Sequence, residues 1–256
     1  MAASAPWPTV WITGASSGIG RDVALQLARA GVKVAASARS AEALAALAAE
    51  HPGITAFQLD VADAAAVAAV VKTIEASLGP ISLAILNAGV WHPMGAADFD
   101  GRKAKDSIAV NYFGITNAID ALMPLMIARR AGHLAFVASV AGYRGLPKAA
   151  GYSPSKAAVI SLAETLKPDL SAYGVNVSVI NPGFVETPMT SVNKFPMPFM
   201  IKSEDAAQRI IAGLKAGKFE IAFPWQLVSL LKFARILPYP LFFWYSRTFL
   251  SPKKSG

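Results

Sequence analysis

Three residues in the middle of the chain have the types and the spacing of an acid–base centre. Tyr152 and Lys156 stand four residues apart, and Ser139 precedes them. Side chains at this spacing share one face of a helix. A neighbouring cation favours the phenolate and predicts a lowered pKa for Tyr152, which suits proton exchange with a carbonyl oxygen during hydride transfer. A serine hydroxyl at the same oxygen holds it in place and stabilises developing charge.

A second candidate site is the glycine-rich turn from Thr13 to Gly20, which follows an apolar run. Gly14 permits a tight turn, while Gly18 and Gly20 let the backbone approach a pyrophosphate at a helix N-terminus. The spacing Gly-x₃-Gly-x-Gly differs from the Gly-x-Gly-x-x-Gly dinucleotide fingerprint. The alternative interpretation is a simple connection between a strand and a helix.

The end of the second apolar run bears on cofactor choice. Ala38 stands where an acid usually holds the ribose 2′-hydroxyl of NAD, and Arg39 follows it. A guanidinium suits a 2′-phosphate, so the sequence favours NADP(H) over NAD(H). The alternative is that Arg39 is a solvated loop cation or stacks on the adenine.

Short apolar runs alternate along the chain with longer segments of helical spacing. Strands that are apolar throughout and separated by helices predict a parallel sheet covered on both faces, a doubly wound α/β fold of Rossmann type. Such sheets bind ligands at their carboxyl edge. The predicted strands cover residues 9–13, 32–36, 54–59, 83–86, 133–138, 176–180 and 219–223, and the predicted helices 19–30, 42–49, 64–78, 102–129, 155–172 and 203–216.

Six motifs in order make the chain similar to the short-chain dehydrogenase/reductase family over residues 8–223. They are Thr13-Gly14-x₃-Gly18-x-Gly20, Asn87-Ala88-Gly89, Asn111, Ser139, Tyr152-x₃-Lys156 and Pro182-Gly183-x₃-Thr187. The resemblance implies that Tyr152 is the acid/base and that Ser139 orients the substrate oxygen. It also implies that Lys156 binds the nicotinamide ribose and lowers the Tyr152 pKa, and that Asn111 anchors a water in a proton relay.

The same resemblance implies an extended cofactor-binding set, from the adenine end to the nicotinamide end. Its members are Gly14, Ser16, Ser17, Gly18, Ile19, Gly20, Arg39, Asp60, Val61, Asn87, Ala88, Gly89, Tyr152, Lys156, Pro182, Gly183, Val185 and Thr187.

The composition excludes several classes of protein. With 54% hydrophobic and 16% charged residues, the chain is not intrinsically disordered. It has no cysteine and its three histidines show no metal-ligand spacing, so we predict no disulfide and no metal site. The first ten residues hold no basic residue and no apolar run, which predicts a cytoplasmic protein without a secretory signal.

Residues 187–203 correspond in the resembled family to a mobile substrate lid. Here this segment is rich in methionine and phenylalanine and holds no arginine. Such a surface favours a hydrophobic, lipid-like carbonyl or alcohol as substrate. The alternative is ordinary packing of a loop over the core.

Beyond a catalytic domain over residues 1–223, residues 224–256 form a basic, aromatic extension. Residues 206–256 contain eight lysines and arginines and a single acid, Glu220. This stretch therefore supplies most of the net charge of +8. Polar residues recur every third position from Gln226 to Arg235, which predicts a broad apolar face. The charged residues and prolines leave no uncharged run of the ~20 residues that a transmembrane helix needs.

Two interpretations of the extension stay open. One is peripheral contact with an anionic membrane through residues 224–250, and the other is a subunit interface. The basic charge indicates lipid more than nucleic acid. The family resemblance implies a homodimer or homotetramer built on helices around residues 102–129 and 155–172.

The sequence as a whole predicts an NADP(H)-dependent oxidoreductase that interconverts a ketone and a secondary alcohol. Two other classes stay open. One is a nucleotide-binding sensor that keeps the fold without chemistry, and the other is a membrane-surface interaction protein.

Overall fold

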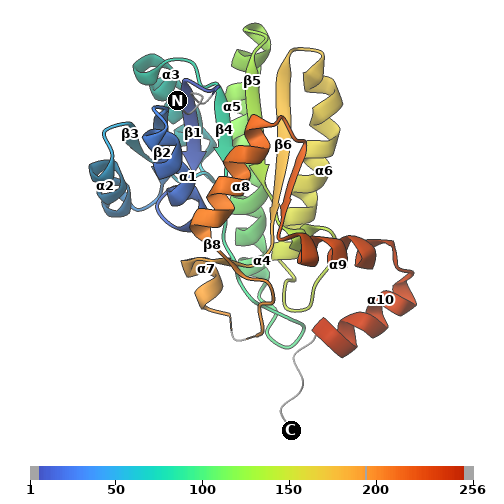
Figure 1. Cartoon of the computed structure of the whole chain (residues 1–256). Coiled ribbons are helices and arrows are strands. Elements are labelled where there is room, and N and C mark those ends of the chain that lie inside the picture. The colour runs from blue at the N-terminus through green and yellow to red at the C-terminus, as the bar shows by residue number, and fades with distance from the viewer. Residues whose placement is uncertain (1–5, 194, 251–256) are drawn as a thin grey trace.

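The computed structural model describes residues 6–193 and 195–250. Its centre is a seven-stranded parallel sheet in the order β3-β2-β1-β4-β5-β6-β9 (Figure 1). This arrangement confirms the predicted doubly wound α/β fold. The strands are β1 (Thr9–Thr13), β2 (Lys33–Ala38), β3 (Ile54–Gln58), β4 (Leu83–Leu86), β5 (Gly132–Val137), β6 (Val175–Pro182) and β9 (Glu220–Phe223).

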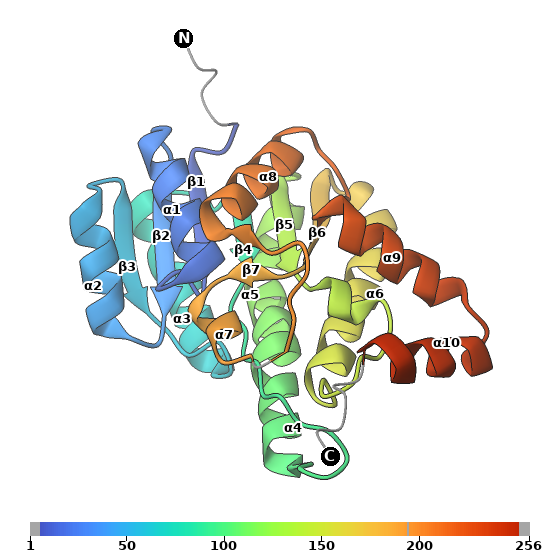
Figure 2. The same ribbon diagram turned by 60° about the horizontal axis from the view of Figure 1, so that its bottom comes forward.

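Helices cover both faces of the sheet, as its uniformly apolar strands require. One apolar core gathers side chains of α1 (Gly18–Arg29), α2 (Ala41–Glu50) and α8 (Ser203–Lys215). The core on the opposite face gathers α3 (Ala64–Leu78), α5 (Gly114–Ala128) and α6 (Tyr152–Ser171). Figure 2 shows these two helical layers on either side of the strands.

The helix predicted over residues 102–129 is not continuous. It consists of α4 (Gly101–Ile108), a π-helical turn (Ala109–Phe113) and α5. The turn contains the buried Asn111, whose amide reaches the backbone of Val90 on the loop after β4. Single π turns are frequent at functional sites. The sequence analysis did not predict this one, because the apolar periodicity gave no sign of a local change in helical register.

Two further boundaries differ from the prediction near the candidate catalytic residues. α6 begins at Tyr152 rather than Ser155, so Pro154 lies in the first turn, where its missing N–H would have no helical partner. β6 continues to Pro182 and pairs with β9 up to Phe223. As a result, Tyr152 begins a helix and Pro182 ends a strand at the carboxyl edge of the sheet.

The chain makes a short excursion between β6 and α8. β7 (Val185–Glu186) pairs with β8 (Ile201–Lys202), and α7 (Pro188–Ser191) lies between them. Figure 2 shows this excursion crossing the carboxyl edge of the sheet beside α4. The predicted lid segment is therefore anchored at both of its ends.

The C-terminal extension forms α9 (Trp225–Ile236), α10 (Tyr239–Tyr245) and a π-helical turn (Ser246–Leu250). Both views place α9 and α10 beside the N-terminal end of α6 (Figures 1 and 2). Leu227, Val228 and Leu231 of α9 are buried in the same core as α6. Among the described residues, no helix has both the length and the apolarity needed to cross a bilayer.

Candidate active site

The glycine-rich turn between β1 and α1 has the backbone geometry that its sequence predicts. Gly14 has φ +67° and Gly18 has φ +52°, a region that side chains disfavour. A side chain on Gly20 would overlap the Gly14 carbonyl oxygen and come within 2.6 Å of Asn87 Nδ2. The turn is therefore a cradle that any Cβ atom would fill.

The N-terminus of α1 faces this cradle. The N-cap Ser17 makes no side-chain capping bond, and the first turn of α1 contains no acidic residue. The first N–H groups of the helix and its positive dipole end are thus available for an anion. This arrangement fits the pyrophosphate of a dinucleotide.

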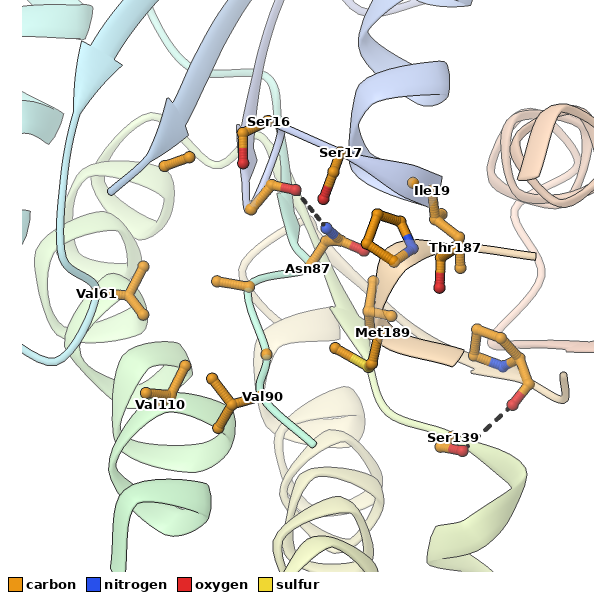
Figure 3. A pocket seen from close by; sticks show the side chains of 18 of the residues that line it. Ser16, Ser17, Ile19, Val61, Asn87, Val90, Val110, Ser139, Thr187 and Met189 are labelled. Carbon is orange, nitrogen blue, oxygen red and sulfur yellow. Dashed lines mark hydrogen bonds between the residues drawn. The ribbon is translucent and has the colours of Figure 1, made fainter. Parts of the chain in front are cut away.

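Asn87 ties the cradle to the end of β4. Its Nδ2 donates to the carbonyls of Thr13 and Gly14, both at 3.1 Å. Thr13 Oγ1 in turn accepts from the backbone N–H groups of Asn87 at 3.0 Å and Ala88 at 3.1 Å. The bond from Asn87 into the turn is visible in Figure 3. Asn87 thus fixes the shape of the turn.

The predicted adenine end of the site includes an exposed cation, Arg39. Arg39 lies just after β2 and is exposed, and its carbonyl accepts from Gln58 Nε2 at 3.0 Å. No described carboxylate forms an ion pair with its guanidinium. Asp60 Oδ1 is engaged by the N–H of Ala62 at 2.9 Å, and Val61 is buried next to it.

Asn111 lies behind the wall of the site. Its Oδ1 accepts from the Val90 N–H at 2.8 Å, and its Nδ2 donates to the Val90 carbonyl at 3.1 Å and to Ser155 Oγ at 2.9 Å. The side chain therefore fixes the loop after β4 against the first turn of α6. Its implied role in anchoring a relay water stays a prediction.

Ser139, Tyr152 and Lys156 converge at the carboxyl ends of β5 and β6. Ser139 Oγ accepts from the Ala141 N–H at 3.1 Å and donates to the Pro182 carbonyl at 3.3 Å. Lys156 Nζ donates to the Val137 carbonyl at 2.8 Å and lies 5.6 Å from the centre of the Tyr152 ring. The phenol, the hydroxyl and the ammonium thus occupy one site, as their spacing predicted.

The electrostatics of this site correct one prediction. Burial raises the pKa of Tyr152, and its hydrogen bond with Ser139 opposes that rise only in part. Burial lowers the pKa of Lys156 to about 8. The prediction that Lys156 lowers the Tyr152 pKa is wrong for this structure, because desolvation of the phenolate dominates and Lys156 Nζ bonds to the Val137 carbonyl.

A cavity of about 410 Å³ joins the three parts of the site. All the predicted site residues line it except Gly20 and Asn111, which lie behind its wall. The sequence analysis missed several apolar and lid residues that also line it. These are Ser40, Leu59, Val90, Val110, Val137, Ala138, Pro188, Met189 and Thr190, each within two positions of a predicted site residue or within the predicted lid.

Trp91 is a further residue that the sequence analysis missed. Its ring meets the Tyr152 ring edge to face, with centroids 5.0 Å apart. Its Nε1 donates to Asn193 Oδ1 at 2.9 Å, in the segment between α7 and β8. Its position two residues after Asn87-Ala88-Gly89 could have indicated that it lies near the site. Trp91 thus connects the candidate acid/base to the predicted lid.

The described residues form no candidate metal site. Within residues 6–193 and 195–250, no group of three or more histidine, cysteine, aspartate or glutamate side chains is placed to hold a metal ion.

The fold and the cavity define a Rossmann-type α/β protein with an oxidoreductase site, and comparison with known proteins agrees. Residues 8–195 match the short chain dehydrogenase family. The chain belongs to this family and is a dehydrogenase/reductase enzyme. An uncharacterized oxidoreductase of Myxococcus xanthus is 40% identical over 238 residues, covering 91% of this chain and 94% of that protein.

Two further relatives bear on cofactor and substrate. A 3-oxoacyl-acyl-carrier-protein reductase, FabG, of Staphylococcus aureus is 34% identical over 184 residues, which cover 70% of this chain and 75% of FabG. A short-chain dehydrogenase/reductase of Burkholderia phymatum, solved in complex with NAD, superposes with a TM-score of 0.82 at 25% identity, covering 90% of this chain and 93% of the other.

Proposed function

We propose that this enzyme uses NADP(H) to interconvert a ketone and a secondary alcohol on a hydrophobic, lipid-like substrate in a reducing cytoplasm. The observation that carries the proposal is the single cavity that joins the glycine cradle, Arg39 and the Ser139–Tyr152–Lys156 group. Bound NADP(H) supplies or accepts the hydride. The protein's own residues position the oxygen and move the proton.

Tyr152 is the proton donor in the reductive direction. Because burial raises its pKa, the phenol keeps its proton at neutral pH and can give it to the substrate oxygen. Ser139 Oγ hydrogen-bonds the same oxygen and stabilises its developing charge. Lys156, with a pKa of about 8, is mostly cationic at neutral pH and would hold the nicotinamide ribose.

The preference for NADP(H) rests on Arg39. Arg39 is exposed and lines the cavity together with its neighbours Ala38 and Ser40. Ala38 stands where an acid of an NAD-binding site would repel a 2′-phosphate, and Ser40 adds a hydroxyl. The relative from Burkholderia phymatum binds NAD, so cofactor choice is the sharpest point at which to test the proposal.

The test is a titration of NADPH and NADH on the wild type and on Arg39→Ala. A charge-assisted contact is worth ~1.5–3 kcal/mol, so we expect NADPH to bind about 10–100-fold more weakly to the variant, with NADH unchanged. Arg102→Ala, which removes a cation with a 93% exposed side chain, is the matched control. Equal wild-type affinities for the two cofactors would contradict the preference.

The hydrophobic substrate class rests on the lining of the cavity. Its only cations are Arg39 and Lys156 and its only acid is Asp60, and the proposal already assigns all three to the cofactor. The other lining residues are uncharged and include the apolar Val90, Val110 and Met189, and Trp91 lies against Tyr152. The segment 187–203 covers this end, with Phe195 meeting Phe184 at 6.1 Å between ring centroids. Such a wall suits an alkyl or acyl chain.

A second candidate function concerns the C-terminal extension, which we propose contacts an anionic membrane surface. Large apolar side chains on α9 and α10 are more than half exposed, namely Trp225, Phe233, Ile236, Tyr239, Leu241, Phe243 and Trp244. We call this set the apolar face. Arg235 and Arg247 are exposed beside it, and no acid follows Glu220 in the sequence.

The charge distribution favours a lipid surface over a second copy of the chain. A two-fold contact would bring the same cations of both copies together without opposing acids. Anionic headgroups would instead pair with Arg235 and Arg247, while aromatic rings occupy the interface. The homodimer or homotetramer expected from the family resemblance would then use helices on the catalytic domain.

Vesicle co-sedimentation tests the apolar face. We expect the wild type to sediment with phosphatidylglycerol vesicles, and the double variant Phe233→Ser/Ile236→Ser to bind at least about 100-fold more weakly, because two side chains of ~1.5–3 kcal/mol each lose burial. Leu125→Ser, at an exposed apolar position of α5, is the control. Unchanged sedimentation of the double variant together with a lower oligomeric state would indicate a subunit interface instead.

A further inference from the structure

The C-terminal helices contact the segment that connects Ser139 to Tyr152. Arg144, in the middle of that segment, donates from Nη1 to the Arg235 carbonyl at 3.0 Å and from Nη2 to the Leu237 carbonyl at 3.3 Å. These carbonyls lie at the end of α9, where helical partners run out. One guanidinium thus caps the last turn of α9.

The same guanidinium holds the start of α10. It lies 4.6 Å from the centre of the Tyr239 ring and 4.4 Å from that of Phe242. Phe242 is buried. Cation–π contacts of this kind add up to ~2 kcal/mol when they are desolvated, so Arg144 fixes both helices of the extension to one point of the catalytic domain.

Tyr143 makes a second connection next to the first. Its hydroxyl donates to Glu220 Oε1 at 2.5 Å, and Asn181 Nδ2 donates to the same oxygen at 2.9 Å. Lys232 of α9 pairs with the other carboxylate oxygen. Burial works against the charge of Glu220, but the hydrogen bonds from Lys232, Tyr143 and Asn181 hold its pKa below the usual value. The carboxylate therefore stays charged and keeps α9 attached.

A third contact joins α9 to the end of β6. A Cβ atom on Gly183 would lie 2.8 Å from Leu227 Cδ2, so α9 packs directly on the residue that follows Pro182. Pro182 accepts the hydrogen bond of Ser139. The extension therefore supports both backbone segments that hold the Ser139 hydroxyl.

We infer that Arg144 is a positioning residue, through which the C-terminal helices hold the segment between Ser139 and Tyr152 in its reactive geometry. This inference rests on the proposed oxidoreductase function. A 3-10 turn (Val140–Gly142) holds the start of the segment, and backbone pairing with Met94 and a bond from the Leu146 N–H to Ser153 Oγ hold its end. Arg144 lies between these two anchors, and its guanidinium joins this middle part to α9 and α10. Without the guanidinium, this segment loses its hydrogen bonds and ring contacts to α9 and α10. Only the connection from Tyr143 through Glu220 to Lys232 is left among those described above, and the two oxygen-binding hydroxyls are held less firmly.

The test compares turnover and NADPH affinity in Arg144→Ala and in the wild type. Displacement of a catalytic group by about 1 Å costs up to about 100-fold in rate, so we expect kcat to fall by about 10–100-fold. The dissociation constant for NADPH should change less than about twofold, because Arg144 does not line the cofactor cavity. Arg144→Lys should recover little of the rate, because an ammonium cannot bridge both carbonyls in a planar fork.

Arg247→Ala is the matched control, since it removes an arginine of the extension that forms no hydrogen bond or ion pair with the 139–152 segment among the described residues. If Arg144→Ala does not fold, Tyr143→Phe, which removes one hydroxyl and retains the ring, should still lower kcat by about 3–10-fold. Equal kcat in wild type and variants overturns the inference alone. Absence of wild-type turnover overturns the proposed function, and the inference with it.

Discussion

The two ends of the cavity are built in different ways. At the nucleotide end, backbone geometry makes the site: glycines with positive φ, an uncapped helix start and the carbonyls that Asn87 holds. At the substrate end, side chains from distant segments make it: Trp91 against Tyr152 and Asn193, and Arg144 against α9 and α10. The first end is determined by local sequence, and the second by tertiary contacts.

This difference predicts two distinct signatures for substitutions. Changes at the nucleotide end should alter cofactor affinity, whereas changes at the substrate end should alter kcat or KM with cofactor affinity unchanged. The largest expected effect is at the junction of the two ends. Tyr152→Phe removes the proton donor, and general acid catalysis contributes about 10²–10⁴-fold, so we expect kcat to fall by about 10³-fold with unchanged NADPH binding.

Steady-state turnover and a cofactor titration check this prediction together, with Tyr173→Phe as the control at an exposed tyrosine near the end of α6. Retained turnover in Tyr152→Phe would remove Tyr152 from the acid/base role. Loss of NADPH binding in parallel would show that the two ends are not separable at this residue.

At the nucleotide end, Gly20→Ala tests the cradle. The new methyl group would meet the Gly14 carbonyl and Asn87 Nδ2, and overpacking of this kind costs ~1–3 kcal/mol. We expect NADPH affinity to fall by about 10–100-fold. Gly101→Ala is the control, because a Cβ atom there meets nothing within 4 Å. Wild-type NADPH affinity in Gly20→Ala would refute the steric argument.

The buried Lys156 should make the free energy of unfolding depend on pH. Its pKa is about 8 in the folded protein and ~10.4 in an unfolded chain, so between these values the unfolded state binds more protons. Folding stability contributed by this group is therefore lowest below pH 8 and rises with pH. Relative to Lys156→Met, the wild-type free energy of unfolding should rise by about 2 kcal/mol between pH 8 and 10.

Denaturant unfolding of both proteins at several pH values measures this difference. Tyrosines of the unfolded chain, with pKa values near 10, also titrate toward the upper limit of pH 10. Because both proteins contain the same tyrosines, the comparison with Lys156→Met removes this contribution. A pH-independent difference between the two proteins would mean that Lys156 is not desolvated in solution.

The smallest expected effect is at the substrate end. Trp91→Phe keeps an aromatic ring against Tyr152 and loses only the bond to Asn193, worth ~1 kcal/mol. We expect KM for a hydrophobic ketone to rise about 3–10-fold, with kcat within about twofold. Asn193→Ala breaks the same bond from the other side and should give the same result. Unchanged KM in both variants would show that this bond does not shape the substrate site.

The sequence predicted the sheet, its helices and most of the lining of the cavity, because these depend on local patterns. Apolar runs specify buried strands, and glycine spacing specifies backbone turns. It did not predict the π turn at Asn111, because that turn is stabilised by Val90 and Ser155 far along the chain. Trp91 and Arg144 were missed for the same reason. The direction of the Tyr152 pKa was wrong because spacing alone does not report desolvation.

The short pairing of β7 with β8 has a consequence for chain entropy. Val185 pairs with Ile201 and Glu186 with Lys202, so residues 187–200 form a loop whose ends are already joined. The entropic cost of closing that loop is met when the protein folds, and each doubling of its length adds only ~0.6 kcal/mol. Insertions there should therefore leave the sheet intact, and if this segment covers the substrate as we predict, they offer a route of low entropic cost by which the enzyme could change what it accepts.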